Sequence, residues 1–207
     1  MIVGVESNFV LVLAFQQEDA DEARSILTLA EEKRIELVLP GCSLTEPYET
    51  LVRRTKDRQQ LLEKLRREIG ELARSEPFAD LSKTSAEVTD ALATSGTHQA
   101  AELQKVIRRI CECATVIPTT ETVAQEGFDA QQRFNLDPQD AFVFASIDIY
   151  MRHAPDGPKL FLNKNRRDFL NDDIKQHMAT YGCELMPTFK NVRRRIEAQL
   201  SGKSKDD

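Results

Sequence analysis

Short aliphatic runs alternate with longer segments of helical spacing along the chain. Strands are predicted at 2–5, 35–39, 115–117, 159–162 and 184–186. Helices are predicted at 19–33, from 43 onward, at 99–111, after Thr119, and at 139–151 and 189–200. Strands separated by helices favour right-handed crossovers and a parallel sheet covered on both faces. The pattern therefore predicts an α/β fold with three layers, α/β/α, around a central parallel sheet of about five strands.

A single domain spanning 1–200 is predicted, followed by a polar, frayed tail at 201–207. The segment 56–112 has helical spacing but neither strands nor a linker, so it is interpreted as a helical insertion within that domain. Inside it, residues 75–97 are rich in Ser, Thr and Asp and contain Pro77 and Gly96. We expect a loop there, with at most one helical turn.

The composition is typical of a globular protein and directs the search for chemistry toward carboxylates. Hydrophobic residues make up 41% of the chain and charged residues 30%. No apolar run is long enough to cross a bilayer, and the run at 9–15 lacks a positively charged leader, so a cytoplasmic protein without a membrane partner is expected. The thiols and imidazoles show no metal-ligand or nucleophile spacing: Cys42, Cys111, Cys113, Cys183, His98, His153 and His177.

The net charge of −6 excludes a uniformly positive surface but leaves room for local basic patches. Basic residues cluster at 53–58, 66–67, 108–109, 164–167 and 193–195. Most such clusters are solvated helix faces. The cluster at 164–167 differs because it lies next to the acidic positions described below.

Acidic and amide residues follow the predicted strands at the points where those strands end. Glu6 follows the first strand, Glu46 lies early in the helix after the second, and Asp140 opens the apolar helix at 139–151. After the fourth strand come Asn163, Asn165 and Asp168. Because ligands of open parallel sheets bind at the carboxyl ends of the strands, we expect these residues to surround one pocket.

Clustered carboxylates repel one another unless a positive charge offsets the repulsion. A hard divalent cation is the usual partner, and Mg²⁺ or Mn²⁺ suits oxygen ligands of this kind. Such an ion activates water and stabilises the charge that develops when a phosphodiester is displaced. The pattern therefore predicts a Mg²⁺ or Mn²⁺ site, with chemistry that needs no histidine.

Each acid also has a purely structural interpretation. The segment 43–46, Ser-Leu-Thr-Glu, is a capping box in which Glu46 would bond back to the helix start. Asp140 follows Asp137-Pro138 and would favour the helix dipole. Glu6 would be a turn residue and Asp168 a surface or cap residue. Only the joint pattern favours a site.

The order of these motifs resembles the PIN-domain family. The segment 5–11, Val-Glu-Ser-Asn-Phe-Val-Leu, resembles the family's opening strand-end motif, usually Asp-Thr-Asn. The segment 37–46 is similar to its second strand and following glutamate, and 136–146 is similar to the buried helix that an aspartate opens. The segment 161–169, Phe-Leu-Asn-Lys-Asn-Arg-Arg-Asp-Phe, resembles its final signature. The resemblance covers residues 1 to about 186, with 56–112 longer than in the minimal family.

The resemblance implies a role for each matching residue. Metal ligands would be Glu6, Glu46, Asp140, Asn165 and Asp168, of which all but Asn165 would be catalytic. Asn8 and Asn163 would orient these ligands or the substrate. Under a nuclease hypothesis Lys164, Arg166 and Arg167 would hold the RNA backbone beside the metal, and a solvated loop is the alternative interpretation of these three residues. Two positions depart from the family pattern: Glu6 replaces the usual aspartate, and Asn165 stands where a fourth aspartate is common. An asparagine supplies no charge, so affinity for a second ion should fall unless Asp168 substitutes.

Two functional hypotheses follow. The first is a Mg²⁺- or Mn²⁺-dependent endoribonuclease that hydrolyses RNA, including single-stranded RNA. A toxin-type nuclease is one form of this hypothesis. The alternative is a catalytically degenerate PIN-like module that binds RNA or protein without cleavage. The resemblance permits an antitoxin or another protein partner, and a homodimer. A receiver domain or phosphohydrolase is less well supported, because the chain lacks the former's adjacent acidic pair and the latter's Asp-x-Asp-x-Thr strand end.

Overall fold

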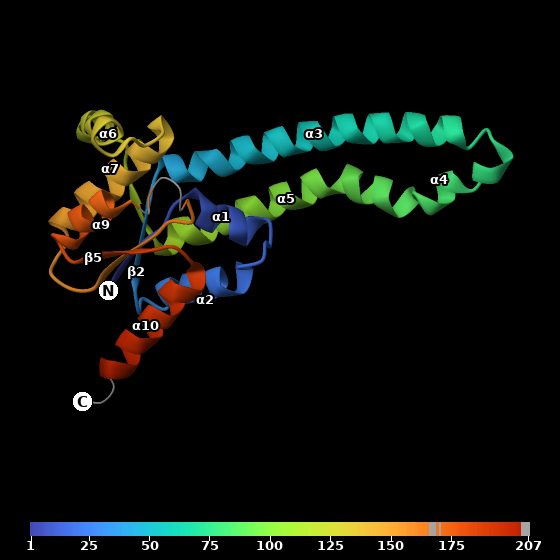
Figure 1. Cartoon of the computed structure of the whole chain (residues 1–207). Helices are drawn as coiled ribbons and strands as arrows, with labels where there is room; N and C mark the ends of the chain where they lie inside the picture. The colour runs from blue at the N-terminus through green and yellow to red at the C-terminus, as the bar shows by residue number, and fades with distance from the viewer. Residues whose placement is uncertain (166–168, 170, 204–207) are drawn as a thin grey trace.

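Five parallel strands form one sheet in the order β3-β2-β1-β4-β5. The strands are β1 (Ile2–Gly4), β2 (Glu36–Pro40), β3 (Thr115–Ile117), β4 (Lys159–Leu162) and β5 (Cys183–Met186). The computed structural model describes residues 1–165, 169 and 171–203. Helices cover both faces of the sheet (Figure 1), so the predicted α/β/α fold with five parallel strands is confirmed.

The helices divide between the two faces because side chains of the central strands alternate. Val3, Leu37 and Leu160 belong to one core cluster, whereas Ile2, Val38 and Phe161 belong to the other. The first cluster packs under α1 (Ser7–Ala14), α2 (Ala20–Glu31), the base of α5 (Ala86–Cys113) and α10 (Phe189–Lys203). The second packs under α6 (Glu121–Phe134), α7 (Pro138–His153) and α9 (Asp172–Ala179).

β1 lies at the centre of the sheet and marks the point where the chain reverses its direction of strand addition. Ile2 pairs with Glu36 of β2 on one side and with Lys159 of β4 on the other. The chain runs from β1 through β2 to β3 and then crosses back to β4. This arrangement creates a topological switch point at the carboxyl ends of β1 and β4, where open α/β sheets bind their ligands.

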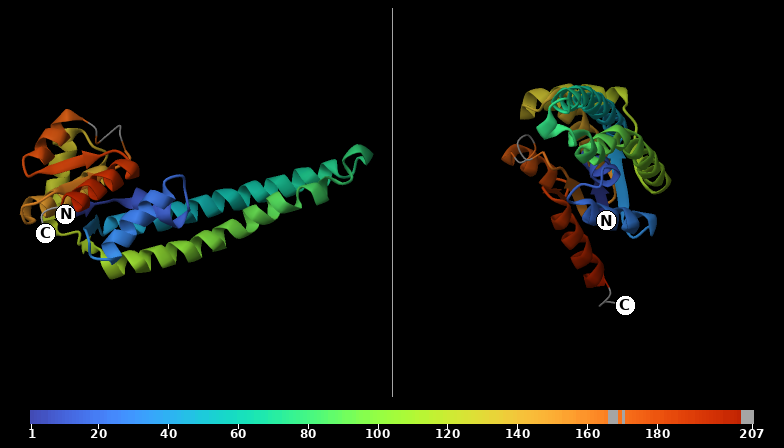
Figure 2. Two further views of the ribbon diagram at one scale, coloured as in Figure 1. Left: turned by 90° about the horizontal axis from the view of Figure 1, so that it is seen from below. Right: turned by 90° about the vertical axis from the view of Figure 1, so that its right-hand side faces the viewer.

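A long helical arm projects from this α/β body (Figures 1 and 2). It consists of α3 (Cys42–Leu72), the short helices η1 (Glu76–Phe78) and α4 (Leu81–Thr84), and α5. α3 has 31 residues and is therefore roughly 45 Å long. It runs alongside α5 (Figure 2), and the arm includes the segment 56–112 that the sequence indicated as an insertion.

The arm is anchored at its base and exposed at its tip. Leu103, Val106 and Ile110 of α5 recur at helical spacing and are buried in the core of the body. Farther out, Leu72, Phe78 and Val88 are exposed. The base of the arm is therefore part of the domain core, whereas the distal part depends mainly on contacts between its own helices.

Several sequence predictions about local structure were wrong. Two helices were missed: no element was predicted for the run at 9–15, most of which lies in α1, or for α9. The predicted loop at 75–97 contains η1, α4 and the first turns of α5. Thr120, not Thr119, caps α6 by accepting a hydrogen bond from the backbone N–H of Val123. Residues 201–203 of the expected frayed tail continue α10, and 204–207 lie outside the described residues.

The anchoring of the arm predicts that its base stabilises the whole domain. Leu103 is fully buried, so Leu103→Ala should lower the free energy of unfolding by about 2–5 kcal/mol in urea denaturation followed by circular dichroism. Val88 is 56% exposed, so Val88→Ala should change it by no more than about 0.5 kcal/mol. Equal effects of the two substitutions would contradict the proposed anchoring.

Candidate functional site

A cavity of about 310 Å³ lies at the carboxyl edge of the sheet, at the switch point. We call it the edge pocket. Its lining residues are Glu6, Ser7, Asn8, Glu46, Asp137, Gln139, Asp140, Val143, Asn163 and Asn165. They come from the ends of β1 and β4, the start of α1, the second turn of α3 and the start of α7. Six of them were predicted from the sequence as site residues, and the fold brings these six together from distant parts of the chain.

Glu6 is the most deeply buried acid of the edge pocket, at 6% exposure. It is the N-cap of α1, and its Oε2 accepts hydrogen bonds from the Ser7 hydroxyl at 2.8 Å and the Asn8 backbone N–H at 2.9 Å. Glu6 therefore has the structural role that was predicted for it and also lies in the predicted site. Both of these hydrogen bonds go to Oε2.

Burial raises the pKa of Glu6 above its ordinary value of 4.5. Desolvation is the largest cause, the hydrogen bonds from Asn8 and Ser7 act in the opposite direction, and the nearby Glu46 raises the pKa slightly further. A positive charge in the edge pocket would remove this penalty. Protonation of the carboxyl relieves the same penalty, so the raised pKa shows that the ionised form of Glu6 is disfavoured in the pocket.

Glu46 lies one turn into α3 and is not used as a cap. The helix begins at Cys42 with Gly41 as its N-cap, and no side chain caps it. The capping-box interpretation of 43–46 is therefore wrong, because Ser43 already lies inside the helix and its hydroxyl is buried without a hydrogen-bond partner among the described residues. No described residue forms a hydrogen bond or ion pair with the Glu46 carboxylate, which lines the edge pocket.

Asp140 and Asn165 contact each other across the edge pocket. The Nδ2 of Asn165 donates to the Oδ2 of Asp140 at 2.8 Å. Asp140 lies in the first turn of α7, after Asp137 at the N-cap and the proline at N1, as the sequence predicted. An amide ligates a metal through its oxygen. Asn165 would therefore have to turn its amide to become a ligand, and in this arrangement it orients Asp140 instead.

Asn163 fixes the turn that brings Asn165 into place. It is 2% exposed, and its Oδ1 accepts a hydrogen bond from the Asn165 backbone N–H at 2.7 Å. Its own N–H donates to the carbonyl of Met186 in β5 at 3.0 Å. These bonds give Asn163 a positioning role at the end of β4, alongside the substrate contact that the sequence predicted for it.

The remaining predicted residues divide into three groups. Asn8 lines the edge pocket beside Glu6. Lys164 lies outside the lining, where its Nζ pairs with the Asp19 carboxylate at 2.6 Å and sits over the Phe189 ring. The other three predictions, Arg166, Arg167 and Asp168, fall outside the described residues. A phosphate contact by Lys164 would require this surface ion pair to open.

The donor set suits a hard cation, although the carboxylates are not arranged around one. Glu6, Glu46 and Asp140 supply the oxygen ligands that Mg²⁺ and Mn²⁺ prefer. Among the residues that the structure describes, no three acidic, histidine or cysteine side chains converge closely enough to hold an ion. A bound ion would therefore draw these side chains inward, completing its shell with water as Mg²⁺ usually does.

Four lining residues were not assigned to the site from the sequence: Ser7, Asp137, Gln139 and Val143. Asp137 and Gln139 flank Pro138 at the start of α7. The sequence pointed to Asp137 only as a cap, yet it makes no side-chain capping bond. Its position three residues before Asp140, on the same turn of the chain, is the signal that could have placed it in the pocket.

Another buried acid, Asp148, has a structural role. Its Oδ1 contacts His177 Nε2 at 2.8 Å and accepts from the Tyr181 hydroxyl at 2.6 Å, while Oδ2 pairs with Arg152 at 2.9 Å. Burial and this contact raise the pKa of Tyr181 above its ordinary range. With both oxygens occupied, Asp148 ties α7 to α9 and the following turn.

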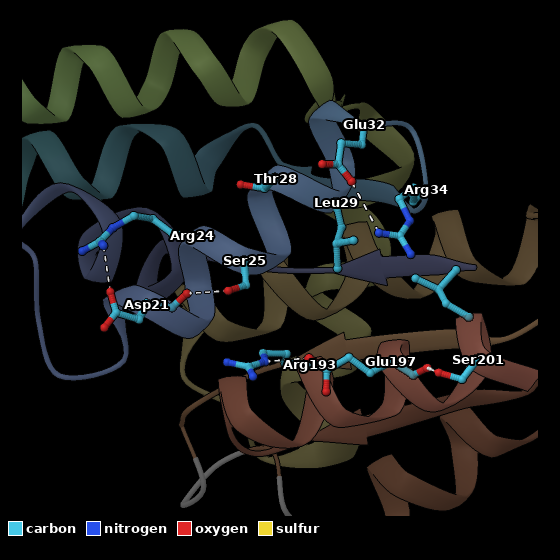
Figure 3. A pocket seen from close by; sticks show the side chains of 11 residues that line it. Asp21, Arg24, Ser25, Thr28, Leu29, Glu32, Arg34, Arg193, Glu197 and Ser201 are labelled. Carbon is cyan, nitrogen blue, oxygen red and sulfur yellow. Dashed lines mark hydrogen bonds and ion pairs between the residues drawn. The ribbon is translucent and has the colours of Figure 1, made fainter.

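A larger cavity of about 890 Å³ lies between α2 and α10 (Figure 3). Its charged side chains already pair with one another: Arg24 with Asp21, Arg34 with Glu32, and Arg193 with Glu197. Because these groups neutralise one another at the surface, the cavity offers no concentrated charge for a ligand. The edge pocket is smaller, but its described lining includes Glu6, Glu46, Asp137 and Asp140 and no basic side chain.

Comparison with known proteins gives no relative for this chain. No protein-family model, curated protein or solved structure matches it. Membership of the PIN-domain family therefore stays a prediction from the motifs. No described helix is long and apolar enough to cross a membrane.

The buried carboxyl of Glu6 predicts a gain in stability when its charge is removed. Its folded-state pKa lies above 4.5, so stability present below that pH is lost as the pH rises through the folded-state pKa. Glu6→Gln keeps an acceptor for Asn8 and should raise Tm at neutral pH in EDTA, measured by calorimetry. Glu49→Gln, at an exposed position on α3, is the control and should leave Tm nearly unchanged. A lower Tm for Glu6→Gln would contradict the desolvation argument.

Proposed function

We propose that this protein is a divalent-cation-dependent nuclease that hydrolyses RNA phosphodiester bonds in the edge pocket. The observation that carries the proposal is the meeting of Glu6, Glu46 and Asp140, which belong to three separate elements, in one cavity at the switch point of the sheet. The PIN-like order of the motifs in the sequence supports the choice of RNA as the substrate.

Each residue of the edge pocket would have its own role in this reaction. Glu6, Glu46 and Asp140 would hold Mg²⁺ or Mn²⁺, which supplies Lewis acidity and an activated water when bound. The buried Glu6 gains the most from that charge, because its ionised form is otherwise disfavoured. Asn165 holds the Asp140 carboxylate in place, and Asn163 holds Asn165. Gln139 and Asn8 present polar groups toward the same space, where they can position a sugar-phosphate.

Cleavage of RNA tests the proposal directly. Purified protein with Mn²⁺ should cut single-stranded RNA, and chelation with EDTA should stop the reaction. Asp140→Asn should reduce the rate by at least about 100-fold, because the substitution removes a charged ligand and leaves the size of the side chain unchanged. Glu197→Gln, in the α2/α10 cavity, removes one negative charge far from the edge pocket and should leave the rate unchanged.

The proposal fails if cleavage is absent with Mn²⁺, or if Asp140→Asn and Glu197→Gln cut equally well. Circular dichroism of both variants should match the wild-type spectrum, so that a lost activity is not a lost fold. A rate that survives Asp140→Asn would point to a contaminating nuclease or to another site.

One observation favours a second candidate, a module that binds without cleaving. Asn165 directs Nδ2 at Asp140, and no three acids of the described chain surround an ion position. A degenerate site would bind RNA or protein with an affinity indifferent to EDTA and to Glu46→Gln. Calorimetric titration with Mn²⁺ separates the candidates, since heat that disappears in Glu46→Gln supports the nuclease, and absence of heat supports the binding module.

A further inference from the structure

A strongly basic segment lies on the arm, on the helix that also carries Glu46. Residues 53–67 of α3 contain seven basic and two acidic side chains, in a chain with 28 basic and 34 acidic residues overall. The basic residues are Arg53, Arg54, Lys56, Arg58, Lys64, Arg66 and Arg67. Positive charge is therefore concentrated in the middle of α3, although the whole helix carries seven basic and six acidic residues.

Two of these side chains hold the arm together. Arg54 lies over the ring of Phe15 in the body, 5.1 Å from its centroid. Arg58 donates from Nη1 to Gln99 Oε1 at 2.7 Å and to Ser95 Oγ at 3.2 Å, joining α3 to α5. Their positions are explained by the architecture of the arm, so they are not part of the surface considered next.

Four of the remaining five form what we call the basic stripe: Arg53, Lys56, Lys64 and Arg67. The fifth, Arg66, lies on another side of the helix. All four stripe residues are exposed, and none forms an ion pair with any residue that the structure describes. At 100° per residue, their spacings of three, eight and three positions place them on one face of the helix. The opposite face carries the buried Leu51 and Leu62. The stripe is therefore a solvated row of cations along the outer side of α3.

The basic stripe shares a helix face with the edge pocket. Glu46, which lines the pocket, precedes Arg53 by seven residues, a spacing that returns to the same side of a helix. From Glu46 to Arg67 the helix rises by roughly 30 Å. Asp57, Glu63, Glu68 and Glu71 also lie on or near this face, and Glu49 lies between the pocket and the stripe, so cations outnumber acids on this face only between Arg53 and Arg67.

We propose that the basic stripe binds the phosphate backbone of an RNA strand whose scissile phosphodiester enters the edge pocket. This inference rests on the proposed nuclease function and names the surface that holds its substrate. Solvated, unpaired cations bind phosphates by releasing condensed counterions, and such binding weakens steeply with salt. An acidic pocket repels RNA until a metal ion binds, so the attraction has to come from a neighbouring surface, and the stripe lies on the same helix face as Glu46, with Glu49 between them.

The position of the basic stripe beside the pocket favours RNA over an acidic protein as the ligand of the stripe. A polyanion that follows α3 toward the body arrives at Glu46 and the carboxyl edge of the sheet. A flexible single strand can lie along a straight helix and turn into a cavity of about 310 Å³. Contacts to phosphates carry no sequence information, so the stripe provides affinity and register and leaves specificity to the pocket.

The test is the salt dependence of RNA binding, measured in EDTA so that binding is separated from cleavage. Fluorescence anisotropy of labelled poly(U) is recorded over a range of KCl concentrations for three full-length proteins. The stripe variant is R53Q/K56Q/K64Q/R67Q. The control variant K33Q/R34Q/R108Q/R194Q has the same change in charge at exposed sites that do not line the edge pocket. Of the control residues, only Arg34 forms a described ion pair, a surface contact with Glu32 of little energetic weight.

The stripe variant should reduce the slope of log affinity against log salt by roughly three, since each contact with a single strand contributes about 0.7. It should also weaken binding at low salt by at least about tenfold. The control variant should keep the wild-type slope. Circular dichroism of all three proteins confirms that the arm is still helical.

The other outcomes separate this inference from the proposed nuclease function. Equal slopes for the wild type and the stripe variant would overturn the role of the stripe, even if Mn²⁺-dependent cleavage persisted. Stripe-dependent binding by a wild type that never cleaves would support the stripe and refute the nuclease. Stripe-dependent binding of polyglutamate with no binding of poly(U) would overturn RNA as the occupant in favour of an acidic protein.

Discussion

The parallel pairing of β1 with both β2 and β4 is the constraint on which the candidate site depends. Hydrogen bonding in register brings the ends of β1 and β4 side by side, although some 155 residues separate them in the chain. Glu6 and Asn163 follow those two ends directly, and Glu46 and Asp140 enter from helices above the same edge. Acids that repel one another are held together by the backbone ladder and by the apolar layers beneath it.

Glu6 contributes most of the unfavourable free energy that comes from bringing these acids together. Its carboxyl is buried at the N-cap of α1 and its pKa is raised, whereas hydrogen bonds from Ser7 and Asn8 offset only part of the desolvation. An uncharged side chain at this position would make the folded state more stable. Buried acids with a raised pKa often belong to functional sites, where stability is sacrificed, and this motivates the proposal of a ligand in the edge pocket.

The sequence allowed the strands and the edge pocket to be predicted, because both depend on short-range signals. Runs such as 37–39 and 160–162 are apolar and end abruptly. Because the carboxyl ends of parallel strands share an edge, the residues that follow these runs must meet. The helix at 7–14 was missed because it is apolar on every side and shows no period. The arm between 75 and 97 was mistaken for a loop because Ser and Thr have low intrinsic propensity, which packing against α3 overrides. Glu46 looked like a cap because the start of α3, at Cys42, could not be located to within one residue.

The central claim is that the edge pocket binds a divalent cation through acids from separate elements. Anomalous diffraction from crystals grown with Mn²⁺ tests it most directly. The account predicts a peak inside the edge pocket, in contact with the carboxylates of Glu6, Glu46 and Asp140, with these side chains drawn toward it. A manganese ion bound only at the charged cavity between α2 and α10, or an edge pocket without any peak while Glu6 keeps only its contacts to Ser7 and Asn8, would contradict it.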